Sequence, residues 1–355
     1  MKPEELGYDN NQEKFRIEQN LTGFEIGRVI TEHKERYIVL TGKGEFEAEI
    51  TGNMRFTAED CLDYPAVGDW VTLTIYDDDL AMIHQLFPRK SVLVRQAVGQ
   101  FADKQVIAAN IDDAFIVQSV DRDYNINRLE RYLTLCYSAN VNPVIILSKT
   151  DLINDGELAG IMDKLKSRIK DIEVIALSNQ TLNGYDMLRS ILVKGKTYCF
   201  LGSSGVGKST IINHLAGQKL MKTNTISSST GKGKHTTNRR ELIILENGAV
   251  IIDTPGLREV GIADNSDGLE NTFDQIFRLS SQCKFANCTH THEKGCAVLD
   301  AVEKGVVSMA SYRNYLKMEK ERSHFNTDII EKRKKDRAFG KMCKEAVKYR
   351  RQKKF

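Results

Sequence analysis

The sequence predicts a multidomain α/β protein in which a small β-barrel, an open α/β sheet and a helical metal-binding unit follow one another. Three observations predict this order: short strand-like segments before residue 92, continuous apolar runs separated by helical patterns up to 265, and three of the seven cysteines clustered after residue 280. A chain of 355 residues is long for one domain and agrees with two or three.

Composition restricts the class of protein further. Hydrophobic residues make up 41% and charged residues 28%, as in globular chains rather than fibrous or disordered ones. The apolar runs are far shorter than the ~20 residues of a membrane-spanning helix, and the opening MKPEELGYDN lacks the apolar core of a secretory signal. We therefore expect a cytoplasmic monomer without membrane contact.

The N-terminal quarter of the chain has two parts. Residues 1–20 are polar, and we expect a flexible N-terminus. Residues 21–92 contain the strand patterns EIGRVI, RYIVLT, FEAEIT and, after the turn-like PAVGD, WVTLTIY. Strands at this spacing predict a small barrel. An OB-like barrel that binds oligonucleotides and an SH3-like barrel used only for packing both fit this pattern.

Residues 93–265 have a different pattern. The apolar runs at 114–117, 144–147, 174–176, 198–201 and 249–252 are continuous, and helical segments such as NRLERYLTLCYSA separate them. Continuous runs are typical of strands buried on both faces, and parallel strands need crossover helices. We predict an open, largely parallel α/β sheet.

A glycine-rich segment, GSSGVGKST, stands between the strand-like TYCFL and the helical TIINHLA. It satisfies the phosphate-binding pattern G-x-x-x-x-G-K-[ST] in the context that the pattern requires. Backbone N–H groups of such a loop point at phosphates, while the lysine reaches the β- and γ-phosphates and the following hydroxyl binds Mg²⁺. We assign a catalytic role to Lys208, Mg²⁺ binding to Ser209, and nucleotide binding to Gly202, Ser203, Ser204, Gly205, Val206, Gly207, Lys208, Ser209 and Thr210.

The sequence DTPG follows the predicted strand at 249–252. This D-x-x-G arrangement occurs where a nucleotidase senses the γ-phosphate. Asp253 is predicted to hold Mg²⁺ through water, and Gly256 to offer its N–H to the γ-phosphate.

A third segment indicates guanine recognition. Ser148-Lys149-Thr150-Asp151 follows the strand at 144–147 and is similar to the N-K-x-D sequence of GTPases, with serine in place of asparagine. The Asp151 carboxylate is expected to accept from guanine N1–H and the 2-amino group, a pattern that adenine lacks. Lys149 is expected to pack along the base.

A further guanine contact is expected from the backbone N–H groups of Ala176 and Leu177. They follow the strand-like VIA, with Ile175 at a position where serine is common.

The order of these motifs differs from that of ordinary GTPases. The guanine segment (148–151) precedes the phosphate loop (202–209), and D-x-x-G (253–256) comes last. A circularly permuted P-loop GTPase domain has this order with the same sheet. Permutation also places the segment after D-x-x-G against the next domain, to which nucleotide-dependent motion can pass.

These motifs, with GKGKHTT (231–237), NRLERYL (127–133) and the Cys/His cluster, resemble the circularly permuted ribosome small-subunit-dependent GTPase A (RsgA) family over residues 22–355. The resemblance implies an OB barrel, a permuted G domain and a C-terminal zinc domain. It also implies binding to the small (30S) ribosomal subunit and its rRNA, late in subunit maturation, with GTP hydrolysis to GDP stimulated by that subunit. Other assembly factors are expected partners.

The segment SSSTGKGKHTTN is predicted to be a switch loop because of its glycine, serine and threonine content. Either Thr236 or Thr237 is expected to complete the Mg²⁺ shell. Leu257, which follows DTPG, cannot polarise water as the glutamine of many GTPases does. The resemblance implies that His235 orients the attacking water instead, although a solvent-exposed loop histidine is the alternative.

The clustered cysteines predict one metal site. Cys283, Cys288, His290 and Cys296 form a Cys₃His set, the ligand number of a closed structural Zn²⁺ site. His292 lies nearby, but the family pattern selects His290. Mononuclear iron is the alternative metal. We expect zinc to fold residues 266–330, a segment with no core of its own.

The C-terminal tail, residues 331–355, is strongly basic. It holds 12 Lys or Arg and three acidic residues, a local charge of +9, so the remaining chain carries −6 of the net +3. Such a tail fits a polyanion such as rRNA, with a solvated tail as the alternative.

The sequence therefore predicts a zinc-containing GTPase of small-subunit assembly that uses Mg²⁺ with GTP. Two other functions remain open at this point: a nucleotide-dependent RNA-binding checkpoint whose hydrolysis is incidental, and an ATP-dependent RNA chaperone.

Overall fold

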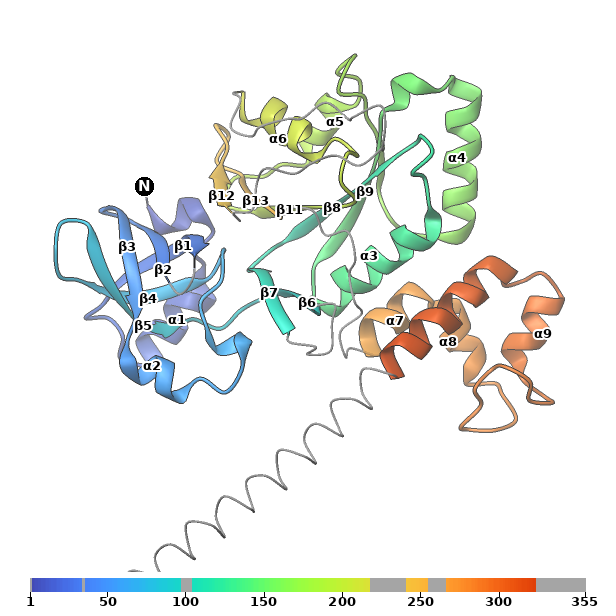
Figure 1. Ribbon diagram of the computed structural model, residues 1–355, viewed down its shortest axis with the longest axis horizontal. Helices are drawn as coiled ribbons and strands as arrows, with labels where there is room; N and C mark the ends of the chain where they lie inside the picture. Colours follow the sequence, from blue (N-terminus) through green and yellow to red (C-terminus); the bar gives the residue numbers. More distant parts are fainter. Residues whose placement is uncertain (1, 34–35, 97–103, 218–240, 255–265, 324–355) are drawn as a thin grey trace, which may run out of the picture.

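Residues 25–86 form a closed five-stranded barrel in the computed structural model, which describes residues 2–33, 36–96, 104–217, 241–254 and 266–323 (Figure 1). The strands pair in the order β1-β2-β3-β5-β4, and β4 returns to β1. Their bounds are β1 (Glu25–His33), β2 (Arg36–Thr41), β3 (Gly44–Ile50), β4 (Trp70–Ile75) and β5 (Leu80–Leu86). Helix α2 (Gly52–Thr57) and the 3-10 turn η2 (Cys61–Asp63) join β3 to β4. This closure is that of an OB fold, so the OB-like prediction is confirmed.

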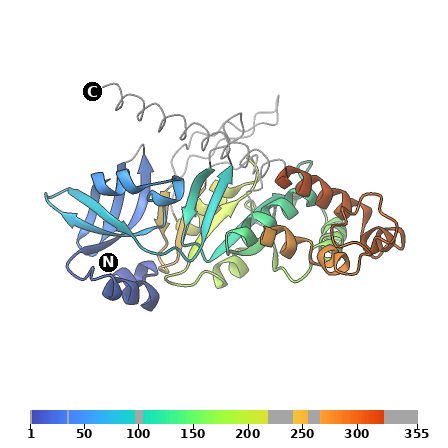
Figure 2. The same cartoon turned by 90° about the horizontal axis from the view of Figure 1, so that it is seen from below.

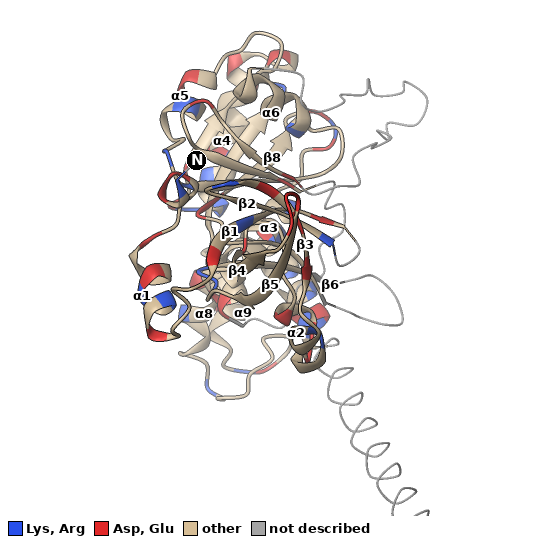
Figure 3. Cartoon of the chain, turned by 90° about the vertical axis from the view of Figure 1, so that its left-hand side faces the viewer, with Lys and Arg blue, Asp and Glu red and all other residues tan. Residues whose placement is uncertain are grey.

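Strand β3 shows how the barrel divides its side chains. Apolar residues alternate with glutamates, and the apolar ones are buried in the interior. Glu45, Glu47 and Glu49 lie on the outer face, and acidic residues colour part of β3 red in Figure 3. Arg36 of β2 pairs with Glu47 at 3.0 Å and with Glu49 at 3.7 Å. The outer face of β3 is therefore negative.

The N-terminal segment corrects the expectation of a flexible residue 1–20 region. A 3-10 turn, η1 (Pro3–Leu6), and helix α1 (Asn10–Glu18) pack under the barrel. Leu6 is 1% exposed, and the Tyr8 ring stands edge-on to Trp70 at 5.0 Å and to Phe87 at 5.9 Å between centroids. A few large apolar side chains anchor an otherwise polar segment, because each buries enough area to offset the cost of ordering it.

The central sheet is open and largely parallel. Its order is β10-β9-β8-β11-β13-β12, with only β12 antiparallel to its neighbour. The bounds are β8 (Asp113–Ser119), β9 (Asn142–Ser148), β10 (Val174–Ala176), β11 (Thr197–Leu201), β12 (Glu241–Ile244) and β13 (Val250–Asp253). A separate hairpin of β6 (Val92–Gln96) and β7 (Lys104–Ala109) leads into it. The predicted parallel sheet is confirmed.

Helices cover both faces of this sheet (Figure 1). Helices α3 (Ile126–Ser138) and α4 (Asp155–Arg168) enclose one apolar cluster, and α5 (Tyr185–Ser190) and α6 (Lys208–Ala216) enclose the other. The 3-10 turn η3 (Thr150–Leu152) precedes α4. Burial on both faces explains why the strand sequences are continuous rather than alternating.

The barrel and the central sheet are joined directly. Strand β1 pairs with β12, with Thr31 opposite Glu241. Arg28 of β1 is 1% exposed and donates to the Gly68 carbonyl at 3.2 Å and to the Thr197 hydroxyl of β11 at 2.8 Å. Burial lowers the pKa of Arg28 to about 10. A guanidinium bonded to both units at this depth fixes one against the other.

The C-terminal unit is helical and lies at the opposite end of the molecule from the barrel (Figures 1 and 2). It contains α7 (Ser266–Thr272), α8 (Asp274–Ser280), α9 (Ala297–Glu303) and a helical segment at 309–323. Within the described ranges, no helix has the length and apolar character to cross a membrane.

Candidate active site and metal centre

The glycine-rich loop runs from the end of β11 to the start of α6. Gly202, Gly205 and Gly207 have φ values of 140°, 83° and 99°, a region that residues with a Cβ rarely adopt. A Cβ on Gly202 would lie 2.3 Å from the carbonyl oxygen of Val117 in β8. The loop can therefore turn at the carboxyl edge of the sheet only with glycine at this position.

Lys208 opens α6, and its side chain folds back into the loop. Its Nζ donates to the carbonyls of Gly202 and Ser203, both at 2.7 Å, and the residue is 6% exposed. The N-terminus of a helix adds positive potential at the same place. The loop thus encloses an ammonium group where the motif places phosphates.

Two side chains outside the loop hold its second half. The fully buried Ser148 donates from Oγ to the Val206 carbonyl at 2.7 Å, and Asn179 Nδ2 lies 3.4 Å from the Gly207 carbonyl. The serine that replaces asparagine in the guanine segment therefore connects that segment to the phosphate loop.

Lys149 follows at the end of β9 in a left-handed conformation, with φ of 61°. Its Nζ donates to Asp121 Oδ2 at 2.8 Å, and the Ser119 hydroxyl donates to Oδ1 of the same carboxylate at 2.8 Å. Burial opposes the charged form of Asp121, but these hydrogen bonds outweigh it and keep the pKa of that carboxyl below its ordinary value. A carboxylate fixed in this way holds the lysine stem in one place.

The Asp151 carboxylate accepts from the Ser178 hydroxyl at 2.6 Å, and Ser178 is 1% exposed. The prediction for Leu177 needs correction, because its N–H donates to the Leu147 carbonyl at 2.8 Å within the sheet and is not available to a base. Ala176 is the last residue of β10, and Ile175 is buried in that strand. The polar residue that faces the guanine segment is therefore Ser178.

Asp253 ends β13 and is 3% exposed. Burial raises its pKa to about 6, against the opposing charge of Lys208. The neighbouring Thr254 donates from Oγ1 to the Phe200 carbonyl of β11 at 2.6 Å, which fixes the strand end beside the phosphate loop. A buried carboxylate with a raised pKa is a place where a divalent cation is stabilising, and a carboxylate with the Ser209 hydroxyl is a donor set that suits Mg²⁺.

Four predicted site residues lie outside the described residues: His235, Thr236, Thr237 and Gly256. Sequence reasoning missed four others that contact the predicted site, namely Asp121, Arg128, Ser178 and Asn179. The pair Ser178-Asn179 follows the strand-like VIA after one intervening residue, and Arg128 lies in NRLERYL, so both had a signal in the sequence.

A family model described as RsgA GTPase matches residues 86–263. The small ribosomal subunit biogenesis GTPase RsgA 2 of Lactiplantibacillus plantarum is 43% identical over 332 residues, covering 92% of each chain. The chain belongs to the RsgA GTPase family. RsgA 1 of Bacteroides thetaiotaomicron is 40% identical over 323 residues, covering 91% of this chain and 90% of the relative.

Solved structures agree with this membership. The crystal structure of YjeQ from Thermotoga maritima matches with a TM-score of 0.63 at 24% identity, covering 84% of this chain and 98% of that one. The structure of YloQ, described as a circularly permuted GTPase, matches at 0.59 and 25% identity, covering 85% and 96%. RsgA GTPases hydrolyse GTP, so the chain is a GTP hydrolase, and the predicted permuted order is confirmed.

The RsgA family chain also carries a compact metal-ligating cluster. The ligand atoms of Cys283, Cys288, His290 and Cys296 all lie within 4.8 Å of one another. The Sγ atoms of Cys283 and Cys296 are 3.9 Å apart, and His290 Nδ1 lies 3.6 Å and 3.4 Å from them. A tetrahedral Zn²⁺ with Zn–S bonds of about 2.3 Å separates two sulfurs by about 3.8 Å. The four donors therefore fit zinc.

Neighbouring groups orient these ligands. Cys296 caps α9 and accepts from the Leu299 N–H at 3.4 Å, while Tyr312 donates to the His290 carbonyl at 2.5 Å. The Glu293 carboxylate accepts from the N–H groups of Thr289, Thr291 and His292, which shapes the loop between the ligands. His292 contacts Thr291 rather than the cluster.

The expectation that this segment has no core of its own is wrong. Eleven buried residues from α7, α8, α9, the 309–323 helix and the connections between them form one apolar cluster that includes Cys296, and Cys283 and Cys288 pack against it. Its members are Leu269, Phe273, Ile276, Cys296, Val298, Ala301, Val302, Val307, Tyr312, Tyr315 and Met318. A metal here adds to a small core rather than replacing it.

Proposed function

We propose that this GTPase acts in late maturation of the small ribosomal subunit and binds the rRNA of that subunit. Its hydrolysis of GTP to GDP and phosphate is faster when the protein is bound to the subunit. The observation that carries the proposal is similarity along nearly the whole chain, 92% of it, to a relative named small ribosomal subunit biogenesis GTPase. Barrel, central sheet and metal-binding unit therefore all fall within the compared length.

In the proposed reaction, the backbone N–H groups of residues 202–210 bind the phosphates of GTP. Lys208 Nζ exchanges the Gly202 and Ser203 carbonyls, on which it now donates, for β- and γ-phosphate oxygens. Ser209 and Asp253 hold Mg²⁺, which, when bound, neutralises negative charge on those phosphates. A loop already closed around a lysine needs little rearrangement to receive an anion.

Asp151 is proposed to read the base. Ser178 donates to Oδ1 of Asp151 and sets the plane of that carboxylate. Asp121 holds the side chain of Lys149, along which the base would pack. His235 is proposed to orient the attacking water, because Leu257 offers no polar group next to DTPG.

For zinc we propose a structural role. Cys283, Cys288, His290 and Cys296 would supply the four ligands that a tetrahedral Zn²⁺ takes, which would leave no position for substrate or water. The ion would hold the loop between α8 and α9 on the apolar cluster beneath it.

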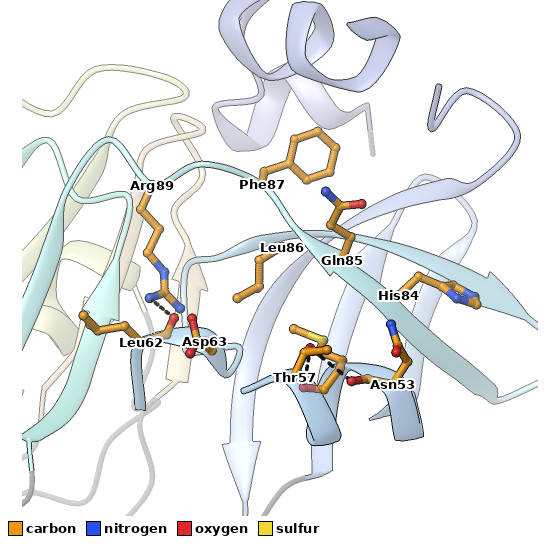
Figure 4. A pocket seen from close by; sticks show the side chains of 10 residues that line it. Asn53, Thr57, Leu62, Asp63, His84, Gln85, Leu86, Phe87 and Arg89 are labelled. Carbon is orange, nitrogen blue, oxygen red and sulfur yellow. Dashed lines mark hydrogen bonds between the residues drawn. The ribbon is translucent and has the colours of Figure 1, made fainter. Parts of the chain in front are cut away.

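We propose that the rRNA-binding surface excludes the outer face of β3. Its three glutamates would repel a phosphate backbone (Figure 3). Figure 4 shows the hollow beside α2, about 530 Å³ in volume, with Arg89 at one end. It is also a poor anion site, because Arg89 is committed to Asp69 at 2.6 and 2.8 Å and to the Leu62 and Tyr64 carbonyls. The positive charge that rRNA phosphates need is offered instead by the 309–323 helix, through exposed Arg313, Lys317 and Lys320, and by the basic sequence of residues 331–355.

The test is nucleotide hydrolysis at fixed salt, with GTP or ATP, each alone, with purified small subunits and with large subunits. We expect GTP turnover to rise strongly with small subunits only. Equal stimulation by large subunits, or no stimulation, would contradict the ribosomal role while leaving GTP hydrolysis intact. Preference for ATP would contradict the assignment of Asp151.

A further inference from the structure

Helix α3 touches the phosphate loop on one side and the zinc-binding unit on the other. The contacts that charged side chains make on both sides come from the segment NRLERYL, at positions within one helical turn of each other. The helix therefore links the nucleotide site to the C-terminal unit by a route separate from the segment that follows DTPG.

On the loop side the charged contact is made by Arg128, beside Tyr132, whose hydroxyl also hydrogen-bonds the Ser203 side chain. Its Nη1 lies 2.6 Å from the Ser203 hydroxyl oxygen and 2.6 Å from Asp123 Oδ2. Ser203 also provides one of the two carbonyls that Lys208 Nζ contacts. Arg128 thus contacts the same residue, Ser203, whose carbonyl Lys208 must leave when a phosphate binds in the loop.

On the side of the zinc-binding unit, Arg131 forms a two-bonded pair with Glu321, with both N···O distances 2.7 Å. Glu130, 2% exposed, accepts from Arg168 of α4 at 2.6 Å and from Asn314 of the 309–323 helix. Burial outweighs these bonds and raises the pKa of Glu130. Side chains of α3 and α4 together hold this helix.

The packing between α3 and α7 is close enough to transmit small shifts. A Cβ on Gly268 of α7 would lie 2.0 Å from Ser138 Oγ and 2.4 Å from the Thr134 carbonyl oxygen, so the two helices meet backbone to backbone. Thr134 also donates to Thr272 Oγ1 at 2.9 Å. A helix held this tightly cannot rotate without moving its neighbour.

We infer that Arg128 is a positioning residue for the phosphate loop, and that α3 couples nucleotide binding to docking of the zinc-binding unit. The inference rests on the proposed nucleotide site. When the 309–323 helix docks on Arg131 and Glu130, α3 is held in place. Arg128 then keeps its hydrogen bond to Ser203, and the phosphate loop keeps the conformation that binds phosphate. Coupling of this kind is reciprocal, so bound nucleotide also tightens the docking of the 309–323 helix.

The test is a double-mutant cycle on GDP affinity in the full-length, zinc-loaded protein, with Arg128→Ala, Arg131→Ala and the double variant. We expect each single variant to weaken GDP binding by about 5- to 10-fold, which is at the lower end of ordinary coupling between two sites. In the Arg128→Ala background, Arg131→Ala should change the affinity less than about 1.5-fold, because the charged link from α3 to Ser203 is already removed. Arg278→Ala, which removes an exposed pair with Asp274 in the same unit, is the matched control and should change nothing.

A second readout does not depend on affinity. Saturating GDP should slow hydrogen exchange along residues 309–323 in the unmodified protein, but not in Arg128→Ala. If Arg131→Ala loses zinc, Glu321→Gln breaks the same pair from the other side, and Arg131→Lys should recover part of the effect.

The failures are distinguishable. Equal effects of Arg131→Ala in both backgrounds, or no effect in either together with unchanged exchange, would overturn the coupling while nucleotide binding stands. Unchanged GDP binding in Lys208→Ala would instead overturn the nucleotide site on which the inference rests.

Discussion

Replacing Asp151 by asparagine tests base recognition with a change of one atom. Ser178 donates to Oδ1 of this carboxylate at 2.6 Å, so an asparagine side chain at this position would keep its carbonyl oxygen there. Its amide NH₂ would then occupy the place of Oδ2 and face the base. Two donors of guanine, N1–H and the 2-amino group, would meet a donor instead of an acceptor.

The expected loss follows from the bonds removed. A hydrogen bond to a charged group contributes about 1.5–3 kcal/mol, so two contribute about 3–6 kcal/mol. At 1.4 kcal/mol per factor of ten, this is a loss of roughly 10²- to 10⁴-fold in GTP affinity. Since Ser178 retains an acceptor, the fold should be unaffected.

The assay is titration calorimetry with GTP, ATP and xanthosine triphosphate, which carries a carbonyl oxygen where guanine has the 2-amino group. We expect Asp151→Asn to bind the xanthine nucleotide better than GTP, and Asp155→Asn, an exposed aspartate four residues along, to behave as the unmodified protein. GTP affinity within 3-fold of the unmodified protein would refute the assignment of Asp151.

Four further predictions concern the phosphate loop, the Mg²⁺ ligand, the metal centre and the tail. Ser148→Ala removes the donor to the Val206 carbonyl and should lower the free energy of unfolding by about 1–3 kcal/mol; an unchanged urea midpoint contradicts this. The pKa of Asp253 is raised to about 6, so the folded protein binds this proton more tightly than the unfolded chain does. The free energy of unfolding should therefore decrease as the pH rises from about 4 to about 6. Asp253→Asn should flatten this slope and raise the melting temperature at pH 7 without nucleotide, while impairing Mg²⁺-dependent hydrolysis; an identical slope argues against it. Cys296→Ser should lower the zinc content and speed hydrogen exchange in α7–α9 while GTP binding persists, and full zinc content would count against the ligand set. Removing residues 331–355, with a charge of +9, should weaken binding to small subunits and flatten its salt dependence, and an unaltered salt slope excludes the tail.

The chemistry proposed for the site could be predicted from the sequence, because it depends on residue types at fixed local spacing. The phosphate loop needs glycines, a lysine and a hydroxyl within nine residues, and the cluster from Cys283 to Cys296 places four donors within fourteen. The order of the motifs along the chain was sufficient to predict the permutation. The parallel strands were also predictable, since burial on both faces leaves a continuous apolar sequence.

Local sequence patterns do not predict segments whose folded structure depends on contacts with residues far away in the sequence. The N-terminal residues read as flexible, yet Leu6 and Tyr8 are held by Trp70 and Phe87, more than sixty residues away. Strand β5, with His84 and Gln85 in its sequence, takes its place by pairing with β3 and β4 rather than from its own composition.

Only the tertiary structure shows which side chains contact the predicted site residues. Ser178 replaced Leu177 as the contact of the guanine segment because the Leu177 N–H is used by the sheet. Ser148 proved to bind the phosphate loop, and Arg128 and Arg131 proved to face two different units from one helix. Hydrogen bonds between segments more than twenty residues apart leave no periodicity in the sequence, so only the folded chain shows which of its polar side chains meet.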